Sequence, residues 1–225
     1  MIRAVVFDFD GVLANSEPLH YRAFRDVLAQ DGVEFTDDEY YARYLGFDDV
    51  GVFRALSRAR REHWSDDRVA AIVDRKAVRL EELERGGSIL FPGADAAVRR
   101  LAAEFPLAIA SGALKAEIRR VLESTGLAHC FGAVVASEDT AVSKPAPDPY
   151  ARAVELLSAA TGAALKGGEC VAVEDSQWGL DSARSAGLRT IAVTHTYPAG
   201  SLTADLVIAS LDALTPVVVR CFDRT

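Results

Sequence analysis

The sequence is poor in cysteine and contains no long apolar run. Its three cysteines, Cys130, Cys170 and Cys221, are widely spaced and form no CxxC pair. Isolated cysteines in an odd number predict neither a disulfide framework nor a zinc site, and Cys170, within an apolar run, is expected to be a small core residue. No apolar stretch approaches the roughly 20 residues that cross a bilayer, so we expect no membrane partner.

The sequence also lacks a block of positive charge. Its formal net charge is −8 and its pI is about 5.1, which makes nucleic acid or an anionic membrane surface a poor partner. The local basic run at 58–61 is flanked by Glu62 and Asp66, and is expected to be a solvated helix face. An acidic residue, Asp8, comes too early for a signal peptide, and we therefore expect a cytoplasmic protein.

What is present is the composition of an ordinary globular protein. Half of the 225 residues are apolar, enough for one large domain or a domain with an insert. Near the N-terminus, the apolar run 4–7 predicts a buried strand, followed by Asp8, Asp10 and Gly11. Open α/β sheets bind ligands at the carboxyl ends of their strands, and a glycine there permits a sharp turn or a close approach to the ligand.

The segment that follows predicts only helices. Ser16 with Pro18, and later Thr36, are helix start signals. Apolar residues then recur at helical spacing within 19–28, 40–45, 48–56 and 69–83. We therefore expect residues 16–88 to form an all-helical insert.

From residue 91 onward, strand and helix patterns alternate. Helices are expected within 94–103, 115–124, 150–160 and 180–186, and strands within 105–110, 133–136, 169–173, 190–193 and 206–209. This alternation predicts an α/β fold with a doubly wound, Rossmann-like parallel sheet. The expected domains are residues 1–15 with 89–225 as the α/β core, and 16–88 as the helical insert.

Polar residues follow four of the expected core strands. They are Asp8 and Asp10, Ser111, Lys144, and Glu174 with Asp175. The carboxyl ends of parallel strands share one edge, so these groups should converge, although two carboxylates about 4 Å apart repel by roughly 4 kcal/mol at an effective dielectric near 20. A divalent cation relieves this repulsion, and a purely oxygen ligand set indicates Mg²⁺. Magnesium, lysine, hydroxyl and glycine amides together suit a phosphoryl group.

Four sequence motifs carry a resemblance to a known family. The segments DFDGVLANSE, ASG, KPAPDP and VEDSQWG, in this order and spacing, resemble the motifs of the haloacid dehalogenase (HAD) superfamily. The helical insert after the first motif resembles the cap of the branch that contains β-phosphoglucomutase-like and phosphoglycolate-phosphatase-like enzymes. The resemblance covers essentially the whole chain.

The resemblance implies a role for each residue of the acidic cluster. Asp8 would attack phosphorus and form an aspartyl-phosphate, while Asp10 would protonate the leaving alcohol and then deprotonate water. Magnesium would be held by the Asp8 carboxylate, the Asp10 main-chain carbonyl and Asp175. Glu174 would be a direct ligand or a neighbour of the ligands. Taken without the resemblance, Glu174 could serve only to pair with Lys144, and Asp175 could cap a helix.

The resemblance also implies phosphate and substrate contacts. Ser111 and the amides near Gly11 and Gly112 would hold phosphoryl oxygens, and Lys144 would neutralise charge. Taken without the resemblance, Ser111 could cap the next helix and Lys144 could be a surface lysine. The candidate substrate-binding residues are Gly11, Gly112, His20, Gly46 and Lys115. Other candidates in the insert are Tyr44, Phe47, Asp48 and Arg79, whereas Lys76 is expected to be a solvated helix residue.

The expected function is that of a magnesium-dependent phosphatase acting on a small phosphorylated metabolite, such as a sugar phosphate or a phosphoglycolate-like compound. The alternative is a sugar-phosphate mutase. The second motif, residues 111–115, lacks the extra Ser and Asn that mutases place there, although Lys115 keeps the mutase open. From another class, the chain could be a non-catalytic binding module, but no motif residue is missing. We expect a monomer or weak dimer.

Overall fold

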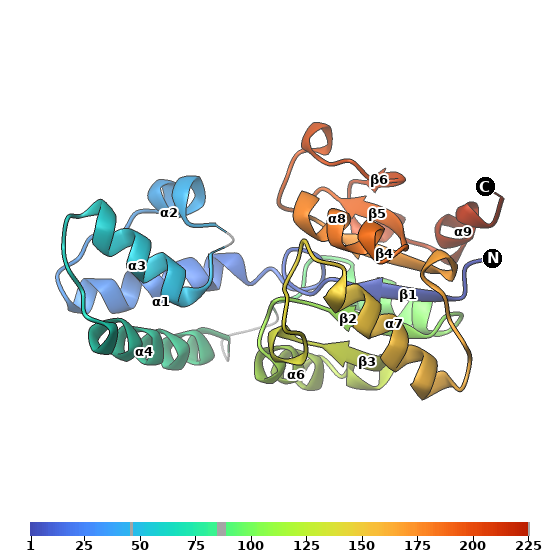
Figure 1. The fold of residues 1–225 in the computed structure, drawn as a ribbon, viewed down its shortest axis with the longest axis horizontal. Coiled ribbons are helices and arrows are strands. Elements are labelled where there is room, and N and C mark those ends of the chain that lie inside the picture. The colour runs from blue at the N-terminus through green and yellow to red at the C-terminus, as the bar shows by residue number, and fades with distance from the viewer. Residues whose placement is uncertain (46, 85–88, 225) are drawn as a thin grey trace. The chain divides into compact units, whose positions relative to one another are not determined.

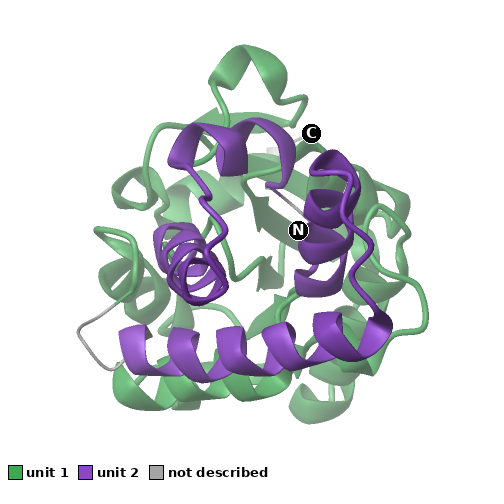
Figure 2. Ribbon diagram, turned by 90° about the vertical axis from the view of Figure 1, so that its left-hand side faces the viewer, with its two compact units in different colours: residues 1–15, 88–225 green, residues 16–87 purple. Residues whose placement is uncertain are grey.

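The computed structural model describes residues 1–45, 47–84 and 89–224, and the chain divides into two compact units. One unit contains Met1–Asn15 and Ser88–Thr225, and the other contains Ser16–Gly87 (Figures 1 and 2). The first unit is α/β and the second is helical. No described helix is both long and apolar enough to span a membrane.

The described strands of the first unit form a six-stranded parallel sheet. Its order is β3-β2-β1-β4-β5-β6, with β1 and β4 at the centre (Figure 1). The strands are β1 (Ala4–Phe7), β2 (Leu107–Ala110), β3 (Phe131–Val135), β4 (Cys170–Glu174), β5 (Arg189–Val193) and β6 (Leu206–Ile208). The predicted fold class is confirmed.

Both faces of this sheet are buried, which explains the apolar runs in the sequence. Val5 and Phe7 of β1 belong to one core cluster, and Ala4 and Val6 belong to the other, because successive side chains of a strand point to opposite faces. Helices α5 (Ala94–Ala102) and α6 (Lys115–Ser124) contribute to the first cluster. Helices α7 (Asp148–Thr161) and α8 (Gln177–Ser185) contribute to the second, which also contains the buried Cys170.

Short helices complete the first unit. The last α-helix is α9 (Pro216–Val219). The 3₁₀ helices are η1 (Ala128–Cys130), η2 (Ser137–Asp139), η3 (Gly167–Glu169), η4 (Ala199–Ser201), η5 (Leu211–Ala213) and η6 (Arg220–Arg224).

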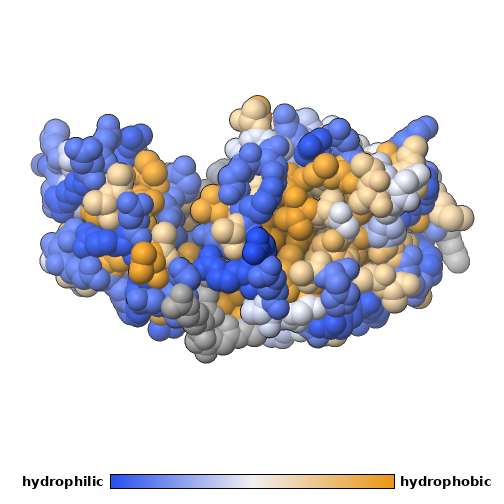
Figure 3. All heavy atoms as spheres, turned by 90° about the horizontal axis from the view of Figure 1, so that it is seen from below, coloured by the Kyte–Doolittle hydropathy of each residue, from blue (hydrophilic) through white to orange (hydrophobic). Residues whose placement is uncertain are grey.

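The helical unit has its own aromatic core. It consists of α1 (Glu17–Gln30), α2 (Asp37–Arg43), α3 (Asp49–Ala59) and α4 (Asp66–Glu84), with no strand among its described residues. Phe24, Phe35 and Phe53 are almost completely buried, and the rings of Phe24 and Phe53 lie 5.3 Å apart in an edge-to-face arrangement. Hydrophilic residues predominate on the face of this unit that is visible in Figure 3.

The two segments that connect the units are paired with each other inside the first unit. The Asn15 amide donates to the carbonyl of Ile89 over 2.6 Å, and the Phe91 amide donates to that of Leu13 over 2.9 Å. These two hydrogen bonds join the segment that leaves the first unit to the segment that returns to it, a few residues after the Asp8–Asp10 motif in the sequence.

Candidate active site

The carboxyl ends of the two central strands bring three carboxylates together. Asp8 directly follows β1, Glu174 ends β4, and Asp175 comes next. Phe7 pairs with Val173 in the parallel register, so Asp8 and Glu174 are neighbours across the two strands. Carboxylate oxygens of the three residues lie within 4.8 Å of one another, and each side chain is buried. The group could hold a metal ion, as the sequence predicts.

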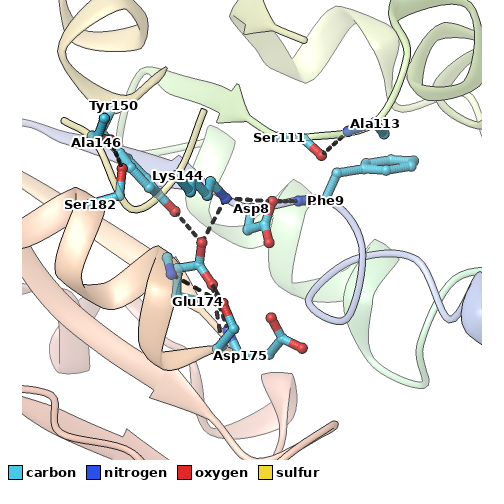
Figure 4. A network of polar contacts seen from close by, with 12 residues as sticks. Asp8, Phe9, Ser111, Ala113, Lys144, Ala146, Tyr150, Glu174, Asp175 and Ser182 are labelled. Carbon is cyan, nitrogen blue, oxygen red and sulfur yellow. Dashed lines mark hydrogen bonds and ion pairs between the residues drawn. The ribbon is translucent and has the colours of Figure 1, made fainter. Parts of the chain in front are cut away.

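Lys144 supplies the positive charge in this cluster. Its Nζ lies 2.9 Å from Asp8 Oδ1 and 2.6 Å from Glu174 Oε1 (Figure 4). Lys144 comes from the proline-rich loop before α7, and its side chain is only 15% exposed. The structure therefore contradicts the alternative of a surface lysine.

The cluster carries more negative than positive charge. Three carboxylates face one ammonium group, so full ionisation leaves two uncompensated negative charges. Burial, and then the charge of Glu174, raise the pKa of Asp8 well above its usual value and that of Asp175 to about 7. Burial alone would lower the pKa of Lys144, but Asp8 and Glu174 raise it above its usual value. A divalent cation would neutralise the two excess charges and favour the ionised forms of Asp8 and Asp175.

Glu174 is held by protein donors on both of its oxygens. Its Oε1 accepts from Lys144 Nζ and, over 2.9 Å, from the hydroxyl of Tyr150. Its Oε2 accepts from the amides of Asp175 and Ser176 and from the Ser176 hydroxyl. A carboxylate offers about four lone-pair sites, so these donors leave little room for direct metal coordination. Ser176, which accepts from the Gly179 amide, is the N-cap of α8, so Asp175 is not needed for that purpose.

The Asp10–Gly11 backbone passes directly over Asp175. Gly11 has φ +75°, and a Cβ at this position would lie 2.0 Å from Asp175 Oδ2. Only glycine has both the conformation and the space for this approach. The Asp10–Gly11 main chain and the Asp175 carboxylate therefore lie next to each other. The Asp10 side chain is half-buried.

Two residues that the sequence reasoning missed contact this region. His195 Nδ1 lies 3.0 Å from the carbonyl oxygen of Gly11, and the Thr196 hydroxyl hydrogen-bonds to the Asp175 carboxylate. Both follow β5 at the same edge of the sheet. Polar residues that follow a core strand were the pattern that identified Asp8 and Glu174. His195 and Thr196 follow β5 in the same way, so the sequence contained a signal for them.

Ser111 and Gly112 follow β2 at this edge of the sheet. Ser111 is buried, and its Oγ accepts a hydrogen bond from the amide of Ala113 over 3.0 Å (Figure 4). It therefore stabilises a local turn and is not the N-cap of α6, which is Leu114. Gly112 is exposed, and a Cβ there would meet nothing within 4 Å. Lys115 pairs with Asp139 over 2.6 Å.

Comparison with known proteins shows the family to which this chain belongs. A family model described as "haloacid dehalogenase-like hydrolase" matches residues 2–187. The chain belongs to this family. It is 32% identical over 208 residues to the protein CbbY of Rhodobacter capsulatus, with 88% of each chain covered. It is 31% identical to a phosphoglycolate phosphatase of Yersinia pseudotuberculosis, over 96% of this chain and 93% of that protein.

A solved structure of the family has the same fold. The crystal structure of CbbY from Rhodobacter sphaeroides in complex with phosphate superposes with a TM-score of 0.81 at 28% identity, over 95% of this chain and 96% of that one. The predicted membership of the haloacid dehalogenase-like family is thus confirmed.

The helical unit of this haloacid dehalogenase-like protein contains a polar cluster of its own. Lys76 Nζ lies 3.0 Å from His20 Nδ1 and 2.7 Å from Asp49 Oδ1. Lys76 is 1% exposed, so the expectation of a solvated residue is wrong. The signal was available, because Lys76 lies four residues from both Ile72 and Leu80 on the buried stripe of α4.

The other candidates in the helical unit have structural contacts of their own. Tyr44 is buried in the aromatic core, and Asp48 caps α3 by accepting from the Gly51 amide. Arg79 pairs with Asp26, while Phe47 is 49% exposed. Gly46 lies outside the described residues.

Proposed function

We propose that this protein is a magnesium-dependent phosphatase that hydrolyses a small phosphorylated metabolite through an aspartyl-phosphate on Asp8. The observation that carries the proposal is the position of Asp8, which is buried beside Lys144 and within 4.8 Å of two further carboxylates. A nucleophilic carboxylate needs a nearby positive charge to accept a phosphoryl dianion, and this arrangement supports that need.

The proposed magnesium ligands are the carboxylates of Asp8 and Asp175 and the main-chain carbonyl of Asp10. The excess negative charge of the cluster and its purely oxygen donors suit Mg²⁺. Glu174, whose oxygens already accept five hydrogen bonds from protein donors, would orient Lys144 and the Asp175–Ser176 turn. When bound, magnesium would orient the phosphoryl group towards Asp8 and neutralise the negative charge of the phosphoryl oxygens.

The reaction would proceed in two displacements. A carboxylate oxygen of Asp8 bonds to phosphorus while the ester oxygen leaves, taking a proton from Asp10. Asp10 then removes a proton from water, whose oxygen displaces Asp8 and releases inorganic phosphate. Lys144 Nζ and the Phe9 amide both donate to Asp8 Oδ1, which holds the carboxylate in one orientation for attack. Ser111 and amides near Gly11 and Gly112 would hold the phosphoryl oxygens; the amide of Gly11 itself already donates to the Ala14 carbonyl.

The relatives support a small phosphorylated metabolite as the substrate. One is a phosphoglycolate phosphatase, and a further relative, 27% identical over 84% of this chain, is a fructose-1-phosphate phosphatase from Escherichia coli. The helical unit would contribute specificity through His20, Gly46 and neighbouring residues, and Lys115 would contribute from the core.

A phosphate-release screen tests the proposal. The purified protein is incubated with Mg²⁺ and a panel of sugar phosphates, phosphoglycolate and nucleotides, with and without excess chelator. We expect release from at least one metabolite and its loss in chelator. Asp8→Asn should reduce kcat by at least about a thousandfold without loss of folding. Asp67→Asn, at an exposed position in α4, is the matched control and should be fully active. Normal release by a folded Asp8→Asn protein would contradict the proposal.

A further inference from the structure

The turn after β5 contacts both backbone and side chain of the candidate active site. His195 reaches Gly11, which is 184 positions away in the sequence, and Thr196 reaches Asp175. We propose that His195 is a positioning residue that fixes the Asp10–Gly11 segment, so that Asp10 can protonate the leaving group. This inference rests on the proposed function.

The contact between His195 and Gly11 has a defined direction. A carbonyl oxygen can only accept, so Nδ1 of His195 carries the hydrogen and donates it over 3.0 Å. The imidazole ring also stacks on Phe91, with ring centroids 4.0 Å apart and an interplanar angle of 23°. Phe91 is itself held by its amide, which donates to the carbonyl of Leu13. The ring is therefore fixed by two different contacts.

Gly11 is the most conformationally free residue of the Asp10–Gly11 segment, so a hydrogen bond to its carbonyl restricts the position of this segment. Glycine loses more conformational freedom on folding than any other residue, and Gly11 directly follows Asp10. The Gly11 amide donates to the Ala14 carbonyl over 2.9 Å, which closes a local loop. The His195 contact joins this loop to β5, which is separated from β1 by β4. It thus ties the Gly11–Val12 peptide, which directly follows Asp10, to the sheet and to Phe91.

The consequence for catalysis depends on the leaving group. An alkoxide is a poor leaving group and needs the proton from Asp10, whereas p-nitrophenolate leaves without one. Displacing Asp10 should therefore slow the first displacement of an alkyl phosphate more than that of p-nitrophenyl phosphate. The ratio kcat/KM reports this first displacement for both substrates.

Two variants separate the hydrogen bond from the ring. His195→Asn keeps an N–H donor near the position of Nδ1, and His195→Phe keeps a ring to stack on Phe91 but has no donor. Each is assayed with p-nitrophenyl phosphate and with the alkyl phosphate that the wild-type protein hydrolyses fastest. Melting temperatures are measured in parallel.

We expect His195→Phe to lose about tenfold in kcat/KM on the alkyl phosphate, the factor that corresponds to one net hydrogen bond, and less than about twofold on p-nitrophenyl phosphate. His195→Asn should recover most of the loss. Equal losses on both substrates, no loss on either, or an Asn variant no better than the Phe variant would overturn the inference.

If His195→Phe does not fold, a variant of Phe91 tests the same inference. Phe91→Leu removes the stacking partner and leaves the donor in place, and it should shift the alkyl-to-nitrophenyl ratio in the same direction. An unchanged ratio in folded Phe91→Leu would then overturn the inference. If the wild-type protein releases no phosphate from any substrate, the proposed function fails first, and the role of His195 falls with it.

Discussion

His20, a partly buried histidine of the helical unit, leads to a quantitative prediction about pH. Burial, and then the neighbouring Lys76 ammonium, lower the pKa of His20 from 6.5 to about 3. Lys76 Nζ donates to Nδ1 of His20, so the folded protein needs this nitrogen unprotonated. Asp49 on α3 pairs with Lys76, and Glu17 on α1 bonds to Tyr40, so neither carboxylate is paired with the imidazole.

The sign and size of the effect follow from linkage. Below about pH 6.5 the unfolded chain takes up a proton at His20 that the folded chain does not, so the free energy of unfolding falls as pH falls towards 3. Each pH unit in this window is worth about 1.4 kcal/mol. Between pH 7.5 and pH 5.0, His20 should therefore reduce the free energy of unfolding by about 2 kcal/mol.

The sequence provides a convenient probe for this measurement. It contains two tryptophans, Trp64 in the helical unit and Trp178 in the α/β unit. In a Trp178→Phe background, the fluorescence of Trp64 reports urea unfolding of the helical unit alone. His20→Asn retains an acceptor for Lys76 but cannot be protonated, so its loss of stability between the two pH values should be smaller by about 2 kcal/mol.

A matched histidine controls for the other titrating groups. His63 is exposed in the same unit, and His63→Asn is the matched control for the replacement of a histidine by asparagine. If His20→Asn and the parent protein lose the same stability between pH 7.5 and 5.0, burial and Lys76 do not depress the pKa of His20.

Three further substitutions probe the acidic cluster. Lys144→Met should abolish phosphate release and lower the free energy of unfolding in chelator by about 3 kcal/mol, because Glu174 loses its buried partner. Gly179→Ala would place a Cβ 1.7 Å from Glu174 Oε1 and should reduce kcat strongly, whereas Gly168→Ala, which meets nothing within 4 Å, should not. Tyr150→Phe removes a buried donor to Glu174, and urea unfolding should show a loss of about 1–2 kcal/mol.

Local patterns in the sequence predicted the elements well. The helix expected at 115–124 is α6 (Lys115–Ser124), and the strand expected at 190–193 lies within β5 (Arg189–Val193). These elements depend on periodicity and on nearby start and stop residues, which are local properties. The meeting of Asp8, Lys144 and Glu174 was predicted for a different reason, namely that parallel strands bring their carboxyl ends to one edge.

Contacts between distant segments were harder to predict. The charge of Lys76 predicted an exposed side chain, yet Lys76 lies on the apolar stripe of α4 and is buried. Its burial is tolerated because His20 and Asp49, which lie on other helices, form hydrogen bonds with the ammonium group. Of the hydrogen-bonding partners of Glu174, Lys144 was predicted and Tyr150 was not, because Tyr150 begins the apolar helical pattern at 150–160 and has the sequence context of an ordinary core residue.

The sequence by itself determined the α/β class, the helical insert and the carboxylates that end the central strands, because periodicity and motif spacing are written along the chain. Only the tertiary structure decided that Glu174 is engaged on both oxygens and that His195 holds the carbonyl of Gly11. The physical reason is that a hydrogen bond requires two groups to meet within about 3 Å, and for residues 184 positions apart only the packing of strands and loops sets that distance.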